Sequence, residues 1–418
     1  MTAISHREVF RHPAFTLLWT GRLLTTIATL MQSVAVGWQV YTVARLSYDV
    51  KTSSFLVGMV GLVQFLPMFA LALLAGETAD RYDRRKILFA CVGLQIICAA
   101  LFTFLSSHPM PSLTAIFAVA ALFGVARAFA MPASNALTPR LVPAKVMPNA
   151  IAWMTLSTQG GMVLGPWLGG VLCAISPFWA NATAGGLYVV ASLTGIALLM
   201  MPIDAKPRHS GGRRIAMIKE GLTYLWSNKI VLGAISLDLF AVLLGGVTAL
   251  LPVFAHDILH IGADGFGQLR SSAAIGGGAV TLVLSRYPIT RRAGAWMLGA
   301  VMVYGVATTI FAFAREIWLS MAMLVVLGAA DSISVFVRQS LVQIVTPDPM
   351  RGRVSAVSSL FISASNELGE FESGVAARLL GPVGAVVFGG LGSIAVTLLW
   401  AKLFPALRKA DRLEAPEM

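Results

Sequence analysis

The chain has 418 residues, of which 57% are hydrophobic and only 12% are charged, and its formal net charge is +12. Its mean hydropathy is +0.79. A soluble protein of this length would carry about twice that charged fraction. The composition therefore excludes a water-soluble globular protein and indicates an integral membrane protein.

About twelve segments are apolar and long enough to cross a bilayer, which takes ~20 residues each. The predicted spans are approximately 14–44, 53–79, 86–106, 112–140, 147–175, 179–201, 230–256, 264–286, 292–314, 316–346, 351–379 and 382–404. The sequence thus predicts an all-α membrane protein with twelve transmembrane helices in two pseudo-symmetric six-helix bundles. We expect the bundles at 1–201 and 230–418, joined by a cytoplasmic linker at 202–229 with a short amphipathic helix.

Two similar glycine-containing phrases lie about half a chain apart, GMVLGPWLGG at 161–170 and SNELGEFESG at 365–374. At one common offset, Gly165 matches Gly369 and Gly170 matches Gly374. A repeat of half the chain in apolar sequence is typical of transporters, whose two halves enclose a site near the bilayer midplane. The repeat predicts a duplicated bundle.

Basic residues gather in the loops on one side of the membrane if the spans alternate in direction. The opposite loops hold little beyond Lys51 and Arg315. This asymmetry predicts that both termini are cytoplasmic, and it accounts for the net charge without a nucleic-acid partner. The N-terminus lacks the pattern of a cleavable signal peptide, so we expect the first membrane helix to direct insertion.

Several charged residues fall inside the predicted spans, where each costs several kcal/mol unless it faces a cavity or a partner. These residues are Arg22, Arg127, Asp238, Arg270, Asp331, Arg338, Glu367, Glu370 and Glu372. The third, sixth, ninth and twelfth spans carry no charged residue away from their ends. This pattern predicts four three-helix units, each with one helix that faces lipid.

The tenth span carries a polar stripe, because Asp331, Ser334 and Arg338 recur on one face of a helix. The repeat aligns Asp331 with Arg127 of the first half. We expect these opposite charges to pair across a central cavity. The alternative is a permanent structural ion pair without a role in transport.

The eleventh span carries two carboxylates on nearly one side, Glu367 and Glu370, with Glu372 pointing almost oppositely. Neighbouring carboxylates at membrane depth cannot all stay ionised cheaply. We expect one of Glu367 and Glu370 to carry a coupling proton. Asp238 and Asp331 are rival sites, and neutralisation of a nearby arginine is the structural alternative.

The loop after the second span, GETADRYDRRKIL, resembles the G-x-L-a-D-R-x-G-R-(R/K) motif of the major facilitator superfamily. The matching residues are Gly76, Asp80, Arg81, Arg84 and Arg85, whereas Thr78 and Asp83 depart from the leucine and the second glycine. The resemblance implies a conformational latch at this loop that transport must break. It also implies two six-helix halves that rock to give alternating access.

The fifth span resembles the antiporter motif of the same superfamily, G-x-x-x-G-P-x-x-G-G. The matching residues are Gly161, Gly165, Pro166, Gly169 and Gly170. Small residues allow close helix approach and a proline bends the helix. The opening FRHPAFTLLWTGRLL and the segment TPDPMRGRVSAV look like the branch that contains the bacterial enterobactin exporter and related efflux carriers. The resemblance implies export driven by proton exchange.

The favoured hypothesis is a proton-coupled exporter of small amphipathic molecules such as drugs or siderophores. Import of a small polar nutrient by proton symport is the alternative. The expected partners are the substrate, protons and the lipid of a bacterial inner membrane, with a monomeric protein and no cofactor. No enzyme is expected, since phosphate-binding and nucleophile motifs are missing from the sequence. The metal-like spacing of His256, Asp257, His260 and Asp264 is better explained by an exposed polar loop.

Overall fold

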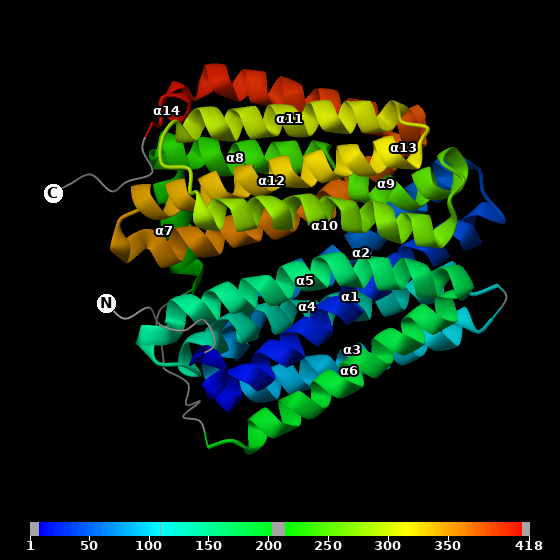
Figure 1. The fold of residues 1–418 in the computed structure, drawn as a ribbon, viewed down its shortest axis with the longest axis horizontal. Helices are drawn as coiled ribbons and strands as arrows, with labels where there is room; N and C mark the ends of the chain where they lie inside the picture. The colour runs from blue at the N-terminus through cyan, green and yellow to red at the C-terminus, as the bar shows by residue number, and fades with distance from the viewer. Residues whose placement is uncertain (1–7, 109, 203–213, 412–418) are drawn as a thin grey trace. The chain divides into compact units, whose positions relative to one another are not determined.

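The computed structural model describes residues 8–108, 110–202 and 214–411, and it is almost entirely helical (Figure 1). The long helices are α1 (Pro13–Arg45), α2 (Val50–Arg81), α3 (Arg84–Ser106), α4 (Leu113–Leu137), α5 (Met147–Ile175), α6 (Pro177–Met200), α8 (Lys229–Leu244), α10 (Gly262–Arg286), α11 (Ala293–Phe313), α12 (Ile317–Val345) and α13 (Asp348–Leu403). The shorter helices are α7 (Arg214–Ser227), α9 (Val247–Val253) and α14 (Pro405–Arg408).

In the part of the chain that the structure describes, 10 helices are long and apolar enough to cross a membrane. A further helix, α10, has 25 residues but a more polar sequence. The long α13 turns at Gly381, whose φ of 79° suits a residue without Cβ, and Pro382 follows it. This break makes two crossings of α13. The predicted all-helical fold with twelve membrane helices is confirmed.

The span that contains α8 is interrupted. It runs from Lys229 to Ile258, but the regular helix α8 ends at Leu244, and the helix resumes as α9 after Gly245 and Gly246. A break at membrane depth leaves backbone carbonyls without their helical partners, and other groups must satisfy them. Here the Tyr304 hydroxyl of α11 donates a hydrogen bond to the Gly245 carbonyl at 2.7 Å.

Contacts divide the chain into two compact units. Unit 1 comprises Met1–Ser47, Val63–Gly211 and Gly262–Ser271, and unit 2 comprises Tyr48–Leu62, Gly212–Ile261 and Ser272–Met418. The helices α2 and α10 are therefore each shared between the units. The division into bundles at 1–201 and 230–418 stays a prediction from the sequence.

Glycines at equivalent positions of the repeat make equivalent helix contacts inside the two units. In unit 1, Gly165 of α5 lies against Ile27 of α1. In unit 2, Gly369 of α13 lies against Val242 of α8. The pair Gly124 and Gly328 behaves in the same way, packing α4 on α2 and α12 on α10. The repeat in the sequence thus corresponds to repeated packing.

The second pair of repeated glycines lies at two very close helix contacts. Within unit 1, a Cβ on Gly170 of α5 would lie 2.7 Å from the Gly267 Cα of α10. Within unit 2, a Cβ on Gly374 of α13 would lie 2.9 Å from the Gly58 Cα of α2. Approaches this close need small residues on both helices.

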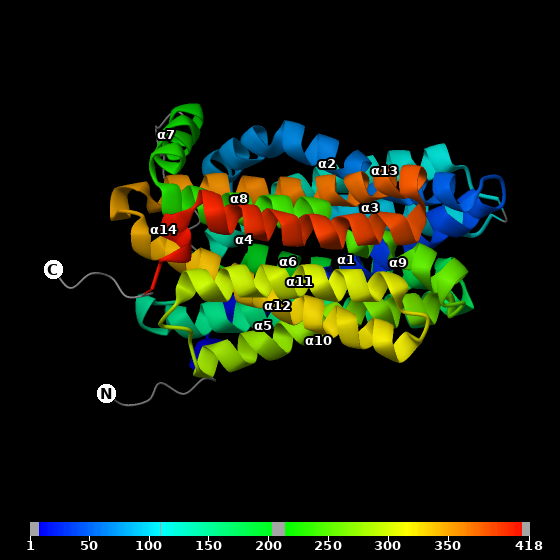
Figure 2. The ribbon, with the colours of Figure 1, turned by 90° about the horizontal axis from the view of Figure 1, so that it is seen from above.

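The short helix α7 runs across, rather than along, the long helices of unit 2 (Figure 2). Two polar contacts hold α7 near the turn between α12 and α13. The Tyr224 hydroxyl donates to the Val345 carbonyl at 3.0 Å, and Glu220 pairs with Arg353 at 2.5 Å. Since the Glu220 and Arg353 side chains are substantially exposed, the hydrogen bond and the burial of Leu225 hold α7 more firmly than the ion pair does.

Candidate functional site

A buried ion pair joins α8 to α12 within unit 2. Arg338 Nη2 is 3.4 Å from Asp238 Oδ2, and the two side chains are only 2% and 6% exposed. Burial removes both charges from water, so each is stable there mainly because the other is present. The sequence placed both residues at membrane depth, but their pairing follows only from the structure.

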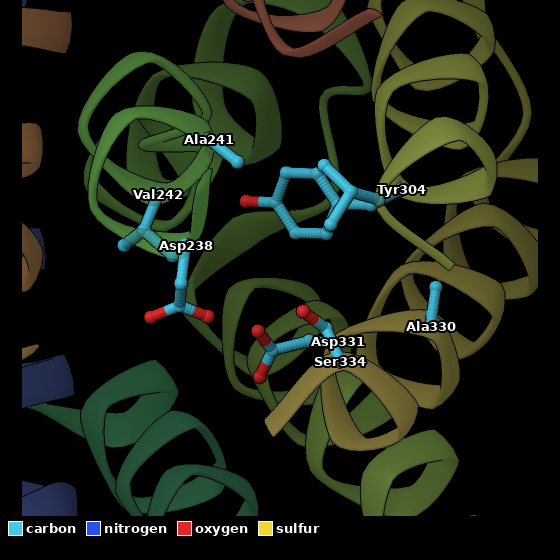
Figure 3. Close-up of a pocket in the computed structure, with 8 residues that line it drawn as sticks. Asp238, Ala241, Val242, Tyr304, Ala330, Asp331 and Ser334 are labelled. Carbon is cyan, nitrogen blue, oxygen red and sulfur yellow. The ribbon is translucent and has the colours of Figure 1, made fainter. Parts of the chain in front are cut away.

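A small pocket lies beside this pair, lined by residues of α8, α11 and α12 (Figure 3). The carboxylates of Asp238 and Asp331 face the same space, and the Ser334 side chain lies next to Asp331 (Figure 3). The pocket has room for about one water molecule. The polar stripe predicted along the tenth span therefore borders the pocket.

Two polar groups of this pocket have no hydrogen-bond partner among the described residues. The Ser334 hydroxyl is unsatisfied although the residue is only 3% exposed. In the same part of the chain, the Asp331 carboxylate has neither a hydrogen bond nor an ion pair, and the charges that act on it are Asp238 and Arg338. Buried polar groups are normally satisfied, so this arrangement can accept a small polar or charged guest.

Tyr304 closes one side of the pocket and is a residue that sequence reasoning missed. Its ring lies against Gly245, where a Cβ would be 2.5 Å from a ring carbon, and its hydroxyl binds the Gly245 carbonyl. Tyr304 therefore connects the pocket to the break between α8 and α9. The available signal was the single tyrosine of α11, whose other residues are uncharged and mostly apolar.

Two deep arginines of unit 1, Arg22 and Arg127, donate hydrogen bonds to neutral side chains. Arg22 of α1 donates to the Ser134 hydroxyl of α4 at 2.9 Å and to the Thr158 hydroxyl of α5 at 3.4 Å. Arg127 of α4 donates to Gln64 Oε1 of α2 at 2.9 Å. In the described chain no carboxylate pairs with Arg22. The predicted pairing of Arg127 with Asp331 links residues of different units and stays a prediction.

The carboxylates of α13 lie elsewhere in unit 2. Glu367 is 9% exposed, and its carbonyl lies beside Gly61 of α2. A Cβ on Gly61 would be 2.9 Å from the Glu370 carboxylate. Glu367 and Glu370 thus lie along the contact of α13 with α2, whereas Asp331 borders the α8–α12 pocket. Their role as proton carriers stays a prediction.

The loop that resembles the family's latch joins α2 and α3. Arg81 pairs with Glu77 at 2.7 Å on an exposed surface, Arg84 is buried and Gly76 lies within α2. Arg85 reaches the end of α6, where it donates to the Leu198 and Met201 carbonyls. The side chain of Asp80 lies outside the described residues.

Asp83, which departs from the family's second glycine, has a structural task. Its carboxylate caps α3 by accepting a hydrogen bond from the Arg85 backbone N–H at 2.9 Å, and it pairs with the Arg85 side chain at 2.9 Å. Partial burial opposes ionisation of Asp83, but these bonds from Arg85 outweigh it and lower its pKa. Asp83 therefore orients Arg85 toward α6.

The antiporter-like motif packs α5 onto two neighbours in unit 1. Gly161 and Gly165 lie against Thr26 and Ile27 of α1, and Gly169 lies against Met31. A Cβ on Gly267 of α10 would meet the Pro166 carbonyl, which places the proline at the α10 contact. The motif residues are therefore brought together as helix contacts, and none of them lines the pocket of unit 2.

The chain is similar to known exporters over nearly its whole length. It is 25% identical over 402 residues to the enterobactin exporter EntS of Citrobacter koseri, covering 95% of this chain and 93% of that protein. The same exporter from Salmonella typhimurium is 25% identical over 403 residues, with coverage of 95% and 94%.

Solved structures with the same fold include transporters of other substrates. The nucleoside transporter NupG superposes with a TM-score of 0.72 at 14% identity, covering 94% of this chain and 99% of that one. The D-xylose–proton symporter gives a TM-score of 0.72 at 15% identity, with coverage of 95% and 98%. At such identities the likeness concerns the fold alone.

The profile of a family described as transmembrane secretion effectors matches residues 4–416. This match agrees with the twelve-helix fold, the repeated packing and the two loop and helix motifs. The chain is a multi-pass membrane transporter that belongs to the transmembrane secretion effector family of the major facilitator superfamily.

Proposed function

We propose that the chain exports small amphipathic molecules in exchange for protons. The observation that carries the direction is the similarity, over 95% of this chain, to proteins named as enterobactin exporters. The complete glycine and proline pattern of α5 supports the same direction. A siderophore or a drug-like molecule is the corresponding substrate class.

For the exchange of substrate and protons, unit 1 supplies a basic side chain and unit 2 supplies carboxylates. In unit 1, Arg22 lies at membrane depth with hydroxyl partners only among the described residues, which suits the polar or anionic part of an amphipathic substrate. In unit 2, the carboxylates Asp238 and Asp331 outnumber the one arginine, Arg338, beside their pocket. An excess carboxylate at membrane depth suits the uptake and release of a cation.

The protein would lie in the inner membrane of a bacterium with both termini in the cytoplasm. The support for this orientation is the concentration of basic residues in alternate loops. The latch-like α2–α3 loop and the fastened helix α7 would then lie on the cytoplasmic side. Rocking of the two halves would expose the substrate alternately to either side of the membrane.

Import by proton symport is the second candidate, because an importer such as the D-xylose–proton symporter has the same fold and the fold alone does not set the direction of transport. Inside-out membrane vesicles with an acidic lumen separate the two functions. An exporter that exchanges protons should accumulate a siderophore or drug from a test panel, and a protonophore should abolish the accumulation. Vesicles without the protein are the control. Loss of a preloaded polar nutrient from the acidic lumen, together with protons, would support the importer instead.

A further inference from the structure

We infer that Asp331 and Ser334 of α12, with the Asp238–Arg338 pair beside them, form a binding site for one small monovalent cation in unit 2. This inference rests on the proposed function in one respect, since the cation is the ion exchanged for substrate. The site itself is defined by the pocket between α8, α11 and α12 (Figure 3). It differs from the α13 carboxylates that the sequence favoured.

The charge beside the pocket favours a cation. Arg338 compensates one carboxylate, Asp238, at 3.4 Å, and the second carboxylate, Asp331, has no partner in the described chain. The group therefore carries one uncompensated negative charge at membrane depth, where such a charge is costly. A single positive charge neutralises it. A divalent cation would leave a net positive charge and would need six or more oxygen ligands, which this pocket does not offer.

The unsatisfied Ser334 hydroxyl supports the same site. Ser334 is 3% exposed, lines the pocket and has no hydrogen-bond partner in the described part of the chain. A hydroxyl can donate to an ionised Asp331, accept from a protonated one or offer an oxygen to a metal cation. Space for about one water molecule fits a proton carried by Asp331 or a nearly dehydrated sodium ion.

The charged surroundings of Asp331 are few. The α8 helix contributes Asp238, α11 contributes Tyr304, and α12 itself contributes Arg338. The part of α10 in unit 2 carries Arg286 only, at its end. The α13 carboxylates Glu367, Glu370 and Glu372 are not among the charges that act on Asp331. The charges of Asp331, Asp238 and Arg338 therefore control whether a cation occupies the site.

Binding of the cation changes which carboxylate Arg338 can pair with. While Asp331 is ionised and unoccupied, it competes with Asp238 for Arg338, which lies two turns away on the same helix. When a cation neutralises Asp331, Arg338 stays with Asp238 and keeps α12 joined to α8. Tyr304 extends this effect to the α8–α9 break, because its hydroxyl binds the Gly245 carbonyl.

The test measures binding to the purified full-length protein without substrate, so it is independent of export. Infrared difference spectra are recorded during a pH titration in sodium-free buffer, and thermal unfolding is recorded with sodium chloride against choline chloride at equal ionic strength. A protonated-carboxyl band that disappears in Asp331→Asn identifies the proton. Stabilisation by sodium over choline that disappears in Asp331→Asn identifies sodium. Glu372→Gln is the matched control, and it should preserve the Asp331-dependent carboxyl band or the stabilisation by sodium, whichever the wild type shows.

Ser334→Ala tests the site if Asp331→Asn does not fold. Loss of the hydroxyl should shift the midpoint of the carboxyl band or weaken sodium binding roughly tenfold. Absence of both an Asp331-dependent band and a sodium-specific stabilisation in the wild type would overturn the inference, as would an unaltered signal in Ser334→Ala. Export that does not respond to a pH gradient, with cation binding intact, would contradict the proposed proton coupling and leave the site standing.

Discussion

Arg338 pairs with Asp238 on α8, although Asp331 lies two turns away on its own helix. The ion pair joins α8 to α12, two of the helices that border the pocket of unit 2. It leaves Asp331 as a second carboxylate for which no further arginine lies beside the pocket in the described chain. An ion pair with side chains 2% and 6% exposed cannot be broken at one end without leaving a buried charge.

A double-mutant cycle on this pair is the first prediction. Arg338→Gln and Asp238→Asn should each destabilise the protein by about 3–5 kcal/mol, because each leaves one buried charge unpaired. The double variant should be more stable than the sum of the two single effects implies. Thermal unfolding of the three variants in lipid nanodiscs measures this. Strictly additive losses would show that the two residues are not coupled.

The cap of α3 gives a prediction about pH. Asp83→Ala removes the acceptor for the Arg85 N–H and should destabilise the protein by about 1 kcal/mol near neutral pH. Because folding lowers the pKa of Asp83, its ionised form contributes stability above the unfolded pKa of about 3.9. That contribution is lost as the pH falls through the lower folded value.

The stability difference between wild type and Asp83→Ala should therefore shrink in acid. Asp83→Asn is the control, since asparagine is an equally good cap but cannot ionise. Unfolding midpoints of the three proteins over a pH series provide the measurement. A difference that stays constant as the pH falls would mean that the cap does not depend on the charge.

The latch-like loop gives a prediction about transport. Asp80→Asn removes one charge from a motif whose neighbours are basic, and it should slow transport while expression and membrane insertion stay normal. Glu77→Gln in the same helix is the comparison, because its exposed pair with Arg81 contributes little. Wild-type transport rates in a well-expressed Asp80→Asn protein would contradict the latch.

The close glycine contacts give a prediction about packing. Gly170→Ala places a Cβ 2.7 Å from the Gly267 Cα, and Gly374→Ala places one 2.9 Å from the Gly58 Cα. Each should destabilise the protein by about 1–3 kcal/mol through overpacking, with a loss of transport. Gly186→Ala in α6 is the matched control, since nothing lies within 4 Å of its added Cβ. Equal unfolding midpoints for all three variants would refute the tight contacts.

The membrane helices and the repeat were predictable because they rest on local properties of the sequence. A bilayer dictates the length of an apolar span, and the turn at Gly381–Pro382 is marked by its residue types. The break at Gly245–Gly246 was missed, because glycine pairs also occur inside continuous membrane helices. Its stabilisation by Tyr304 depends on a helix far away in the sequence.

The site was only partly predictable for a similar reason. Helical spacing placed Asp331, Ser334 and Arg338 on one stripe, and the structure puts all three in the pocket region. Which helix faces that stripe depends on how α8 and α12 are rotated about their axes. Sequence spacing does not contain that rotation, so the pairing of Asp238 with Arg338 could not be predicted, and the pairing of Arg127 with Asp331 stays a prediction.

The exchange of protons for substrate can be measured directly in proteoliposomes that hold a pH-sensitive dye in the lumen. The compound that accumulates fastest in the vesicle panel is added outside, with no pH gradient imposed. We expect the lumen to become alkaline as the compound enters, and we expect Asp331→Asn to abolish this change. Acidification of the lumen, or entry of the compound with no change in its pH, would contradict proton-coupled export.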